Sequence, residues 1–168
     1  SGISIDVIRE RGYRSALTKK ALADVGFKPA QQRPPGLLLP IHTTDGSSSG
    51  LYVYRPDNPR NDKNGRLLKY EFPAGGSIRV DVPPRCKNDL GNPQVCLHVT
   101  EGTKKADALA SHGACAIALQ GVYGFKGKNE FGGVTTLSDF DQIAWKGRDV
   151  VIAYDSDVMT RRQVRDAL

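Results

Sequence analysis

The segment VCLHVTEG (residues 95–102) decides the fold expected for this chain. It is a short apolar run followed at once by an acid and a glycine, which is typical of a buried strand that ends in a loop. Similar runs recur downstream and alternate with helix-like stretches, so the pattern predicts a parallel α/β sheet. The expected strands are residues 95–100, 114–119 and 149–154, and the expected helices are residues 104–111, 138–144 and 160–168.

Acidic residues follow two of these strands. Glu101 comes directly after the first strand, and Asp155 and Asp157 come directly after the last. If the two strands are parallel neighbours, all three carboxylates reach one edge of the sheet. Such a cluster repels itself without a cation, and carboxylate oxygens are the ligands that Mg²⁺ prefers. The pattern predicts a divalent metal site, although Asp is also common in plain turns and helix caps.

The order of these motifs resembles the Toprim domain, which occurs in bacterial-type primases, topoisomerases, recombination mediators and some nucleases. In that resemblance Glu101-Gly102, Gly121 and Asp155-x-Asp157 each follow a strand. More narrowly, the chain looks like a Toprim-like domain of unknown function found in phage, plasmid and mobile-element replication proteins. The matching segments are EGTKKADAL (101–109), LQGVY (119–123) and VIAYDSDV (151–158), preceded by YRPD (54–57) and KYE (69–71).

The resemblance implies roles for individual residues. Glu101 would act in acid–base chemistry at the reacting hydroxyl, and Asp155 and Asp157 would hold Mg²⁺ or Mn²⁺ with it. Gly102 and Gly121 would be structural, with Gly121 allowing close backbone approach.

Two lysines also bear on the resemblance. Lys69, with Tyr70, is similar to a Lys-Tyr pair that lies along the template groove of primases. The chain departs from the primase pattern at Lys105, where an acid is expected four residues after the first Glu.

The preceding region predicts a small α+β subdomain. Two short helices are expected over residues 4–11 and 18–25, and a buried strand over residues 36–41. Strands at 51–55 and 66–72 would form a hairpin with a basic tip. Residues 73–93 are rich in Pro and Gly and predict an irregular connection. We therefore expect a basic subdomain over residues 1–94 and a Toprim-like domain over 95–168, truncated at its C-terminus.

Positive charge is concentrated in the first part of the chain. Residues 1–96 hold 15 Lys and Arg against 9 Asp and Glu, whereas residues 97–168 hold 9 of each. A basic region with interleaved tyrosines favours single-stranded nucleic acid, although a solvated surface over a small tyrosine core is the alternative. The candidate nucleic-acid contacts are Arg55, Arg60, Arg66, Lys69, Tyr70, Lys104 and Lys105.

Composition excludes several other classes of protein. The 168 residues are 39% hydrophobic and 25% charged, as in ordinary globular domains, and no apolar run approaches a membrane span. Three cysteines without close pairing predict free thiols and a reducing compartment. The start of the chain, SGIS, has no initiating Met and no signal pattern, so we expect a fragment of a cytoplasmic protein. No CxxC pair exists, so zinc held by Cys86, Cys96 and Cys115 with His98 or His112 is disfavoured.

These observations lead to one leading hypothesis and two alternatives. The leading one is Mg²⁺-dependent nucleotidyl transfer on a single-stranded DNA template or primer-template, with a helicase or polymerase domain elsewhere in the parent protein. A metal-dependent phosphodiester hydrolase would use the same acids. A non-catalytic module that binds nucleic acid or protein is favoured by Lys105.

Overall fold

The computed structural model of the chain describes residues 2–121, 123–128 and 133–154. Contacts between residues divide the chain into two compact units. Unit 1 comprises Ser1–Glu10, His42–Ser47 and Ile78–Leu168, and unit 2 comprises Arg11–Ile41 and Ser48–Ser77. The domain boundary expected between residues 94 and 95 stays a prediction.

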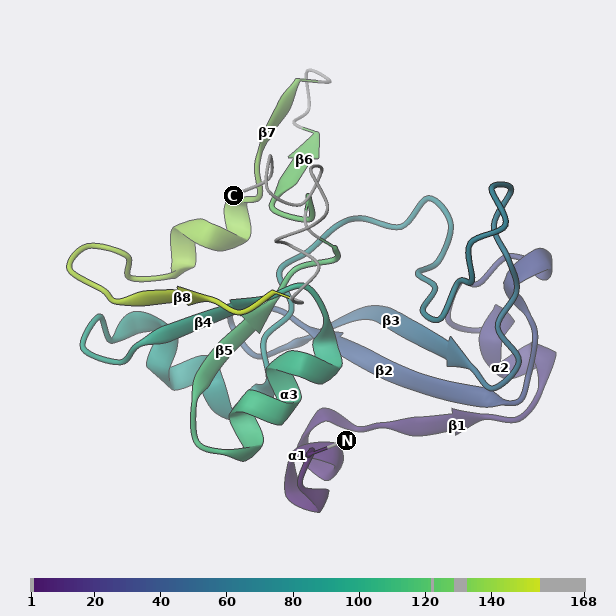
Figure 1. Cartoon of the computed structure of the whole chain (residues 1–168), viewed down its shortest axis with the longest axis horizontal. Helices are drawn as coiled ribbons and strands as arrows, with labels where there is room; N and C mark the ends of the chain where they lie inside the picture. Colours follow the sequence, from purple (N-terminus) through teal and green to yellow (C-terminus); the bar gives the residue numbers. More distant parts are fainter. Residues whose placement is uncertain (1, 122, 129–132, 155–168) are drawn as a thin grey trace. The chain divides into compact units, whose positions relative to one another are not determined.

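Unit 1 is built on the parallel sheet that the sequence predicts (Figure 1). Its strands are β4 (Leu97–Thr100), β5 (Cys115–Ala118) and β8 (Val150–Ile152), in the order β5-β4-β8. The central strand β4 pairs in parallel with both neighbours, so Val99 lies opposite residues of β5 and β8. Helix α3 (Thr103–Ser111) connects β4 to β5. The condition set by the sequence, that the first and last strands are parallel neighbours, is therefore met.

Small side chains let α3 pack closely on the sheet. Ala106 and Ala110 lie one helical turn apart and are fully buried. Ala106 packs with Ala116 and Ala118 of β5, all four residues of which are buried. A second cluster is made of larger residues, namely Val80, Val82, Leu90, Leu97, Ile117, Leu119 and Ile143. Because both clusters include residues of β5, this strand is apolar throughout.

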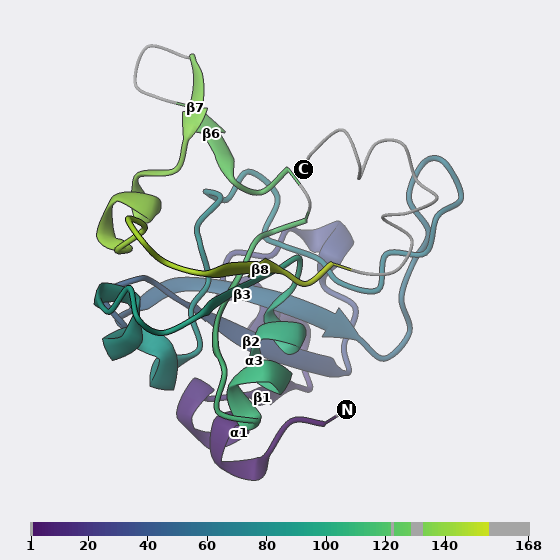
Figure 2. The same cartoon turned by 60° about the vertical axis from the view of Figure 1, so that its left-hand side comes forward.

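The rest of unit 1 consists of short elements. Helix α1 (Ile5–Arg11) follows Ser4, whose Oγ accepts a hydrogen bond from the Val7 amide at 3.4 Å. Residue Asp81 forms an antiparallel bridge to Ala118 and so extends the sheet beyond β5. The remaining elements are η2 (Pro84–Gly91), β6 (Lys126–Lys128), β7 (Val134–Thr136) and η3 (Ser138–Gln142). Figure 2 shows the β6–β7 hairpin projecting from the parallel sheet.

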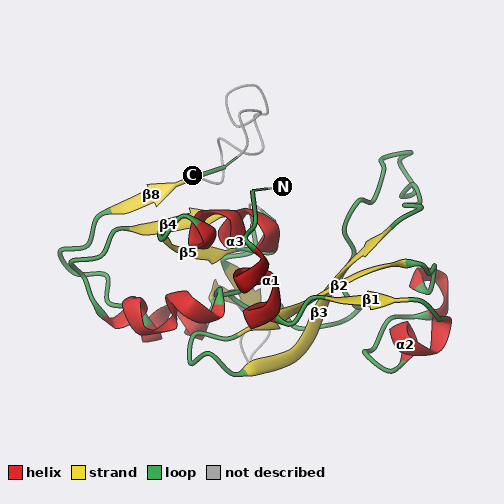
Figure 3. Ribbon diagram, turned by 90° about the horizontal axis from the view of Figure 1, so that it is seen from below, coloured by secondary structure: helices red, strands yellow, loops and turns green. Residues whose placement is uncertain are grey.

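Unit 2 is a three-stranded sheet in the order β1-β2-β3 with short helices at one end (Figure 3). The central strand β2 buries side chains on both faces, because Leu38 packs in one apolar cluster and Leu39 and Ile41 in another. The elements of unit 2 are β1 (Arg14–Ala16), α2 (Lys19–Ala23), η1 (Pro29–Gln31), β2 (Gly36–His42) and β3 (Ser48–Pro56).

Tyr54 of β3 is a core residue of unit 2. Its side chain is fully buried, contacts the Phe27 ring edge-on and donates a hydrogen bond to the Arg33 carbonyl at 2.6 Å. A Cβ atom at Gly36 would lie 2.6 Å from the Tyr54 ring, so glycine is required there. This tyrosine therefore supports the core and is not available for stacking on bases.

Two expected elements differ in the structure. The return strand expected over residues 66–72 is absent from the described residues, where Glu71 and Leu67 form only isolated bridges to Tyr54 and Asn61. The Glu71 side chain points inward to ion-pair with Arg60, which closes this segment as a loop. The helix expected over residues 138–144 is a short 3₁₀ turn. The helix expected from Thr160 lies outside the described residues.

Trp145 is 38% exposed. Its Nε1 donates to the Phe140 carbonyl at 2.8 Å, which ties the indole to the η3 turn.

None of the described helices is long and apolar enough to cross a membrane.

Candidate functional site

Glu101 lies at the carboxyl end of the central strand, between β4 and α3. The preceding residue, Thr100, is fully buried and its Oγ1 donates to the Ile117 carbonyl at 3.2 Å. The Thr100 carbonyl accepts from the Leu119 amide at 2.8 Å. These bonds hold the backbone beside Glu101 against β5. The Glu101 side chain itself is 18% exposed, so a ligand can reach it.

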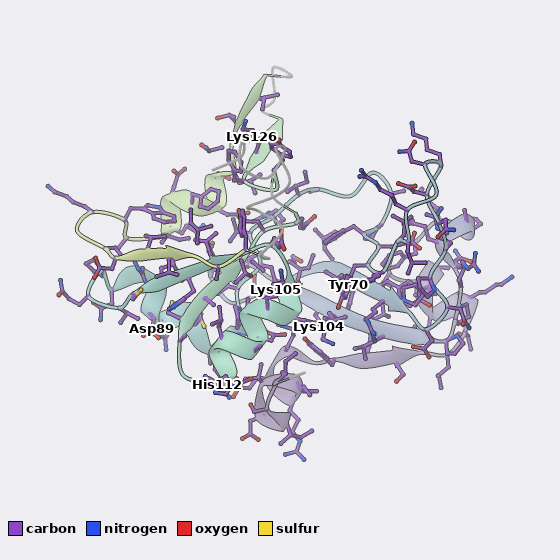
Figure 4. All side chains as sticks on the ribbon, in the orientation of Figure 1. Tyr70, Asp89, Lys104, Lys105, His112 and Lys126 are labelled. Carbon is purple, nitrogen blue, oxygen red and sulfur yellow. The ribbon has the colours of Figure 1, made fainter. Side chains whose placement is uncertain are left out.

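Lys105 forms an ion pair with Glu101. The Lys105 Nζ lies 2.6 Å from the Glu101 Oε1, and the lysine side chain is 37% exposed. Lys104 and Lys105 both lie in the first turn of α3, which contains no acid (Figure 4). From the sequence, Lys105 was identified both as a departure from the primase pattern and as a candidate nucleic-acid contact. Its ion pair with Glu101 was not predicted. The four-residue spacing was the available signal, because such residues are neighbours on a helix.

The chain leaves β8 beside the end of β4. The Ala153 amide donates to the Val99 carbonyl at 2.8 Å, which extends the pairing past Ile152. The next residue, Tyr154, is half-buried, and its pKa is raised by burial and also by the negative charge of Glu101. Because β4 and β8 are parallel neighbours, Tyr154 and Glu101, which follow their carboxyl ends, lie at the same edge of the sheet.

Asp155 and Asp157 lie outside the described residues, so the three-acid cluster stays a prediction. No group of three His, Cys, Asp or Glu able to hold a metal occurs among the residues with described positions. Among the described residues, the partly exposed carboxylate of Glu101 lies at the edge of the sheet where β4 and β8 both end. Carboxylate oxygens are the ligands that Mg²⁺ and Mn²⁺ prefer, and the divalent ion expected at this edge stays a prediction.

The two glycines of the expected site differ. Gly121 has φ +84°, a left-handed conformation that favours glycine, with open space where a Cβ would stand. Gly102 has φ −171°, which any residue adopts. A structural need for glycine is therefore visible only at Gly121.

The candidate nucleic-acid residues of unit 2 fall into two groups. Arg55, Arg66, Lys69 and Tyr70 are exposed, and Tyr70 lies on the segment after β3 (Figure 4). Arg60 instead donates to buried Glu71 through both Nε and Nη2, the shorter distance being 2.6 Å. Its guanidinium is thus already engaged within the protein.

The cysteines and histidines supply no zinc site in the described part of the chain. Cys86, Cys96 and Cys115 are free thiols, and the first and last are buried. The pKa of Cys115 is raised by its hydrogen bond with Cys86 and by burial. His98 is half-buried, and its Nδ1 lies 3.2 Å from the Cys115 carbonyl, within hydrogen-bond distance.

The part of the chain that holds this site matches a known family. Residues 88–168 match the family described as "Domain of unknown function (DUF3854)". The chain is also 28% identical over 148 residues to an uncharacterized protein of Picosynechococcus sp.. The match covers 70% of this chain and 15% of that protein.

Solved primase structures share the fold. A DnaG primase catalytic domain bound to ssDNA has a TM-score of 0.58 and 20% identity, covering 99% of this chain and 53% of that chain. The Aquifex aeolicus primase zinc-binding and RNA polymerase domains have a TM-score of 0.61 and 14% identity, covering 99% and 42%. The chain therefore shares the fold of these primase structures and spans about half of their length.

Proposed function

We propose that this chain carries out Mg²⁺-dependent nucleotidyl transfer on single-stranded DNA as part of a larger replication protein. The observation that carries the proposal is the parallel pairing of β4 with β8. This pairing puts Glu101 and the end of β8 at the same edge of the sheet, where ligands of open α/β folds bind. Asp155 and Asp157 follow Tyr154 in the sequence, and we propose that they join Glu101 there. The similarity to primase structures supports the same chemistry.

Glu101 has the properties of a general base for this reaction. It follows the end of a strand, its side chain is 18% exposed, and its Oε1 lies 2.6 Å from the Lys105 Nζ. It would accept the proton of the attacking hydroxyl. Asp155 and Asp157, with Glu101, would hold the metal, which when bound neutralises phosphate charge and activates the hydroxyl.

The proposed substrate is single-stranded DNA or a primer-template. One of the similar primase structures has ssDNA bound. The exposed cations Arg55, Arg66 and Lys69 of unit 2 suit phosphate contacts, and the exposed Tyr70 ring suits stacking on an unpaired base. Lys104 would add a phosphate contact beside Glu101. A helicase or polymerase domain would lie elsewhere in the parent protein.

The test compares wild type with Asp155→Asn. Calorimetric titration with Mg²⁺ and Mn²⁺ is run beside a single-strand template assay with labelled nucleotides. We expect the wild type to bind metal and extend the template, and the variant to lose both. Cleavage of the template in place of extension would instead identify a phosphodiester hydrolase, because the same acids can direct water.

A non-catalytic DNA-binding module is the second candidate. The observation in its favour is the Glu101–Lys105 ion pair, since Lys105 stands where the primase pattern has an acid. In that case Asp155→Asn leaves DNA binding unchanged or stronger, and neither protein shows metal-dependent turnover. DNA binding with a steep salt dependence and no metal binding would overturn the enzyme proposal.

A further inference from the structure

We propose that residues 60–70 of unit 2 form a wedge that opens DNA where a duplex meets a single strand, with Leu67 as the side chain that packs on the last base pair. We call this segment the basic loop. The inference rests on the DNA binding that the proposed function assigns to unit 2. It goes beyond that function because it makes strand opening an activity of the chain and gives Leu67 a role in it.

The basic loop is shaped by hydrogen bonds within its own backbone. The Leu68 amide donates to the Arg60 carbonyl at 2.8 Å. Nearer the tip, the Asp62 amide donates to the Arg66 carbonyl at 2.8 Å. The Asp62 Oδ1 then accepts from the amides of Asn64 and Arg66 at 2.8 and 2.9 Å, which closes the turn. The loop therefore has a defined form although it has no packed core of its own.

The base of the basic loop is fastened to the core of unit 2. The Arg60 Nη2 lies 2.6 Å from the Glu71 Oε2. Glu71 and Tyr54 exchange two backbone hydrogen bonds of 2.8 Å each, and Tyr54 is fully buried. In Figure 3 the chain that follows β3 extends away from the sheet of unit 2 as a narrow loop. A projecting loop with an anchored base is the form that a wedge requires.

The basic loop presents an apolar side chain among cations. Leu67 is 52% exposed. Residues 61–70 hold three cations against one acid, Asp62, whose Oδ1 is engaged by the two amides of the turn. A single exposed leucine is ordinary on a protein surface. Here, however, the neighbouring charges would bring a polyanion against it. The three cations, all exposed, are Lys63, Arg66 and Lys69.

The junction of a duplex with a single strand is the partner that suits this arrangement. Phosphates attract the cations, whatever the base sequence. Leucine forms no hydrogen bond with a base, but apolar side chains such as leucine unstack bases when they insert between them. The last base pair of a duplex is stacked on one side only, so its open face offers an apolar surface on which Leu67 can be buried. Tyr70, which is 43% exposed, suits stacking on the first unpaired base.

The test uses the full chain and a forked DNA that carries 2-aminopurine in its last base pair. The fluorescence of this base rises when it is unstacked. Anisotropy gives the affinity for the fork and for the single strand at one salt concentration. We expect wild type to prefer the fork and to raise the fluorescence. Leu67→Ala should lose the rise and lower the preference by about three- to tenfold, with little change in single-strand affinity.

Leu17→Ala is the matched control. Leu17 lies in the same unit, outside the basic loop, and is 72% exposed. This variant should keep both the fork preference and the rise in fluorescence. Circular dichroism verifies that each variant is folded.

A second pair of variants separates the shape of the loop from its charge. Asp62→Asn and Asp62→Ala remove the same negative charge, but only asparagine keeps an oxygen that accepts from the two amides of the turn. We expect Asp62→Asn to open the fork as wild type does and Asp62→Ala to bind DNA without opening it. Equal opening by both variants would overturn the requirement for a shaped loop.

The outcomes separate the wedge from the proposed function. If Leu67→Ala opens the fork as well as wild type does, the wedge is overturned and metal-dependent extension still supports the proposed function. If wild type opens the fork but shows no metal-dependent turnover, the wedge stands and the proposed function is overturned. If wild type binds neither DNA, both are overturned.

Discussion

Each unit of the molecule contains a glutamate with a cation 2.6 Å away, but the two acids differ in their surroundings. In unit 2, Glu71 is 4% exposed and accepts hydrogen bonds from Arg60 and from Gln31, which lies 40 residues earlier. In unit 1, Glu101 is 18% exposed and its ion pair is with Lys105, four residues along the chain. A saturated, buried acid stabilises a loop, whereas a reachable acid at a strand end can act on a ligand.

The largest expected effect is on catalysis by Glu101→Gln. Removal of the proposed general base should lower template-dependent turnover by about 10²- to 10⁴-fold, because a neutral amide cannot accept the proton. Initial rates at saturating DNA and nucleotide measure this change. Glu71→Gln is the control and should retain turnover wherever it remains folded. Equal losses in both variants would contradict the comparison.

The free energy of unfolding should rank the two variants in the opposite order, with the larger loss for Glu71→Gln. Glu71→Gln leaves Arg60 and Gln31 without their carboxylate partner, so we expect a loss of about 2–3 kcal/mol, moderated because Arg60 is 31% exposed. Glu101→Gln should change stability by less than about 1 kcal/mol, because its ion-pair partner Lys105 is 37% exposed and can be solvated by water. Urea unfolding gives both values. A stable Glu71→Gln protein would show that Glu71 does not hold the loop.

DNA affinity should fall modestly on substitution of an exposed cation in unit 2. Lys69→Ala should weaken single-strand binding at every sequence and reduce the salt slope by about 0.7, the value for one phosphate contact. Fluorescence anisotropy at several salt concentrations measures both quantities. Lys20→Ala is the control, since Lys20 pairs with Asp24 on α2. An unchanged slope for Lys69→Ala would remove Lys69 from the interface.

The smallest effect is a shift in the titration of Tyr154. Its pKa is raised by burial and by the charge of Glu101, so Glu101→Gln should lower that pKa toward its ordinary value. Because a raised tyrosine pKa stabilises the fold fully at neutral pH, stability should be lost only above about pH 10, as pH rises through the folded pKa. Tyrosinate absorbance, corrected with Tyr154→Phe, tests the shift. An unchanged pKa would place Glu101 away from the end of β8.

Much of unit 1 could be predicted because its signals are local. Apolar runs of strand length, separated by a helix with Ala106 and Ala110 one turn apart, indicate a parallel α/β unit directly.

In unit 2, the prediction was wrong for the return strand at residues 66–72. Alternating residues there resemble a strand, but the Glu71 carboxylate turns inward to Arg60 and to Gln31, and Gln31 lies 40 residues earlier in the chain.

The candidate site was partly visible in the sequence. Glu101 was identified from its place after a strand. Its ion pair with Lys105 was not predicted, although the four-residue spacing could have indicated it. The burial of Tyr54 was not visible, because an alternating tyrosine suits a core and a stacking surface equally well. Its environment depends on Phe27 and Gly36, which come from elsewhere in unit 2.

Local sequence patterns predict the alternation of strands and helices and the acids that follow the strands, because periodicity and turn residues act over a few positions. The folded chain shows in addition that β8 lies beside β4 and that Arg60 is paired with Glu71 while Lys69 is exposed. Strand order and burial arise from contacts between residues far apart in the chain. Local patterns do not encode those contacts.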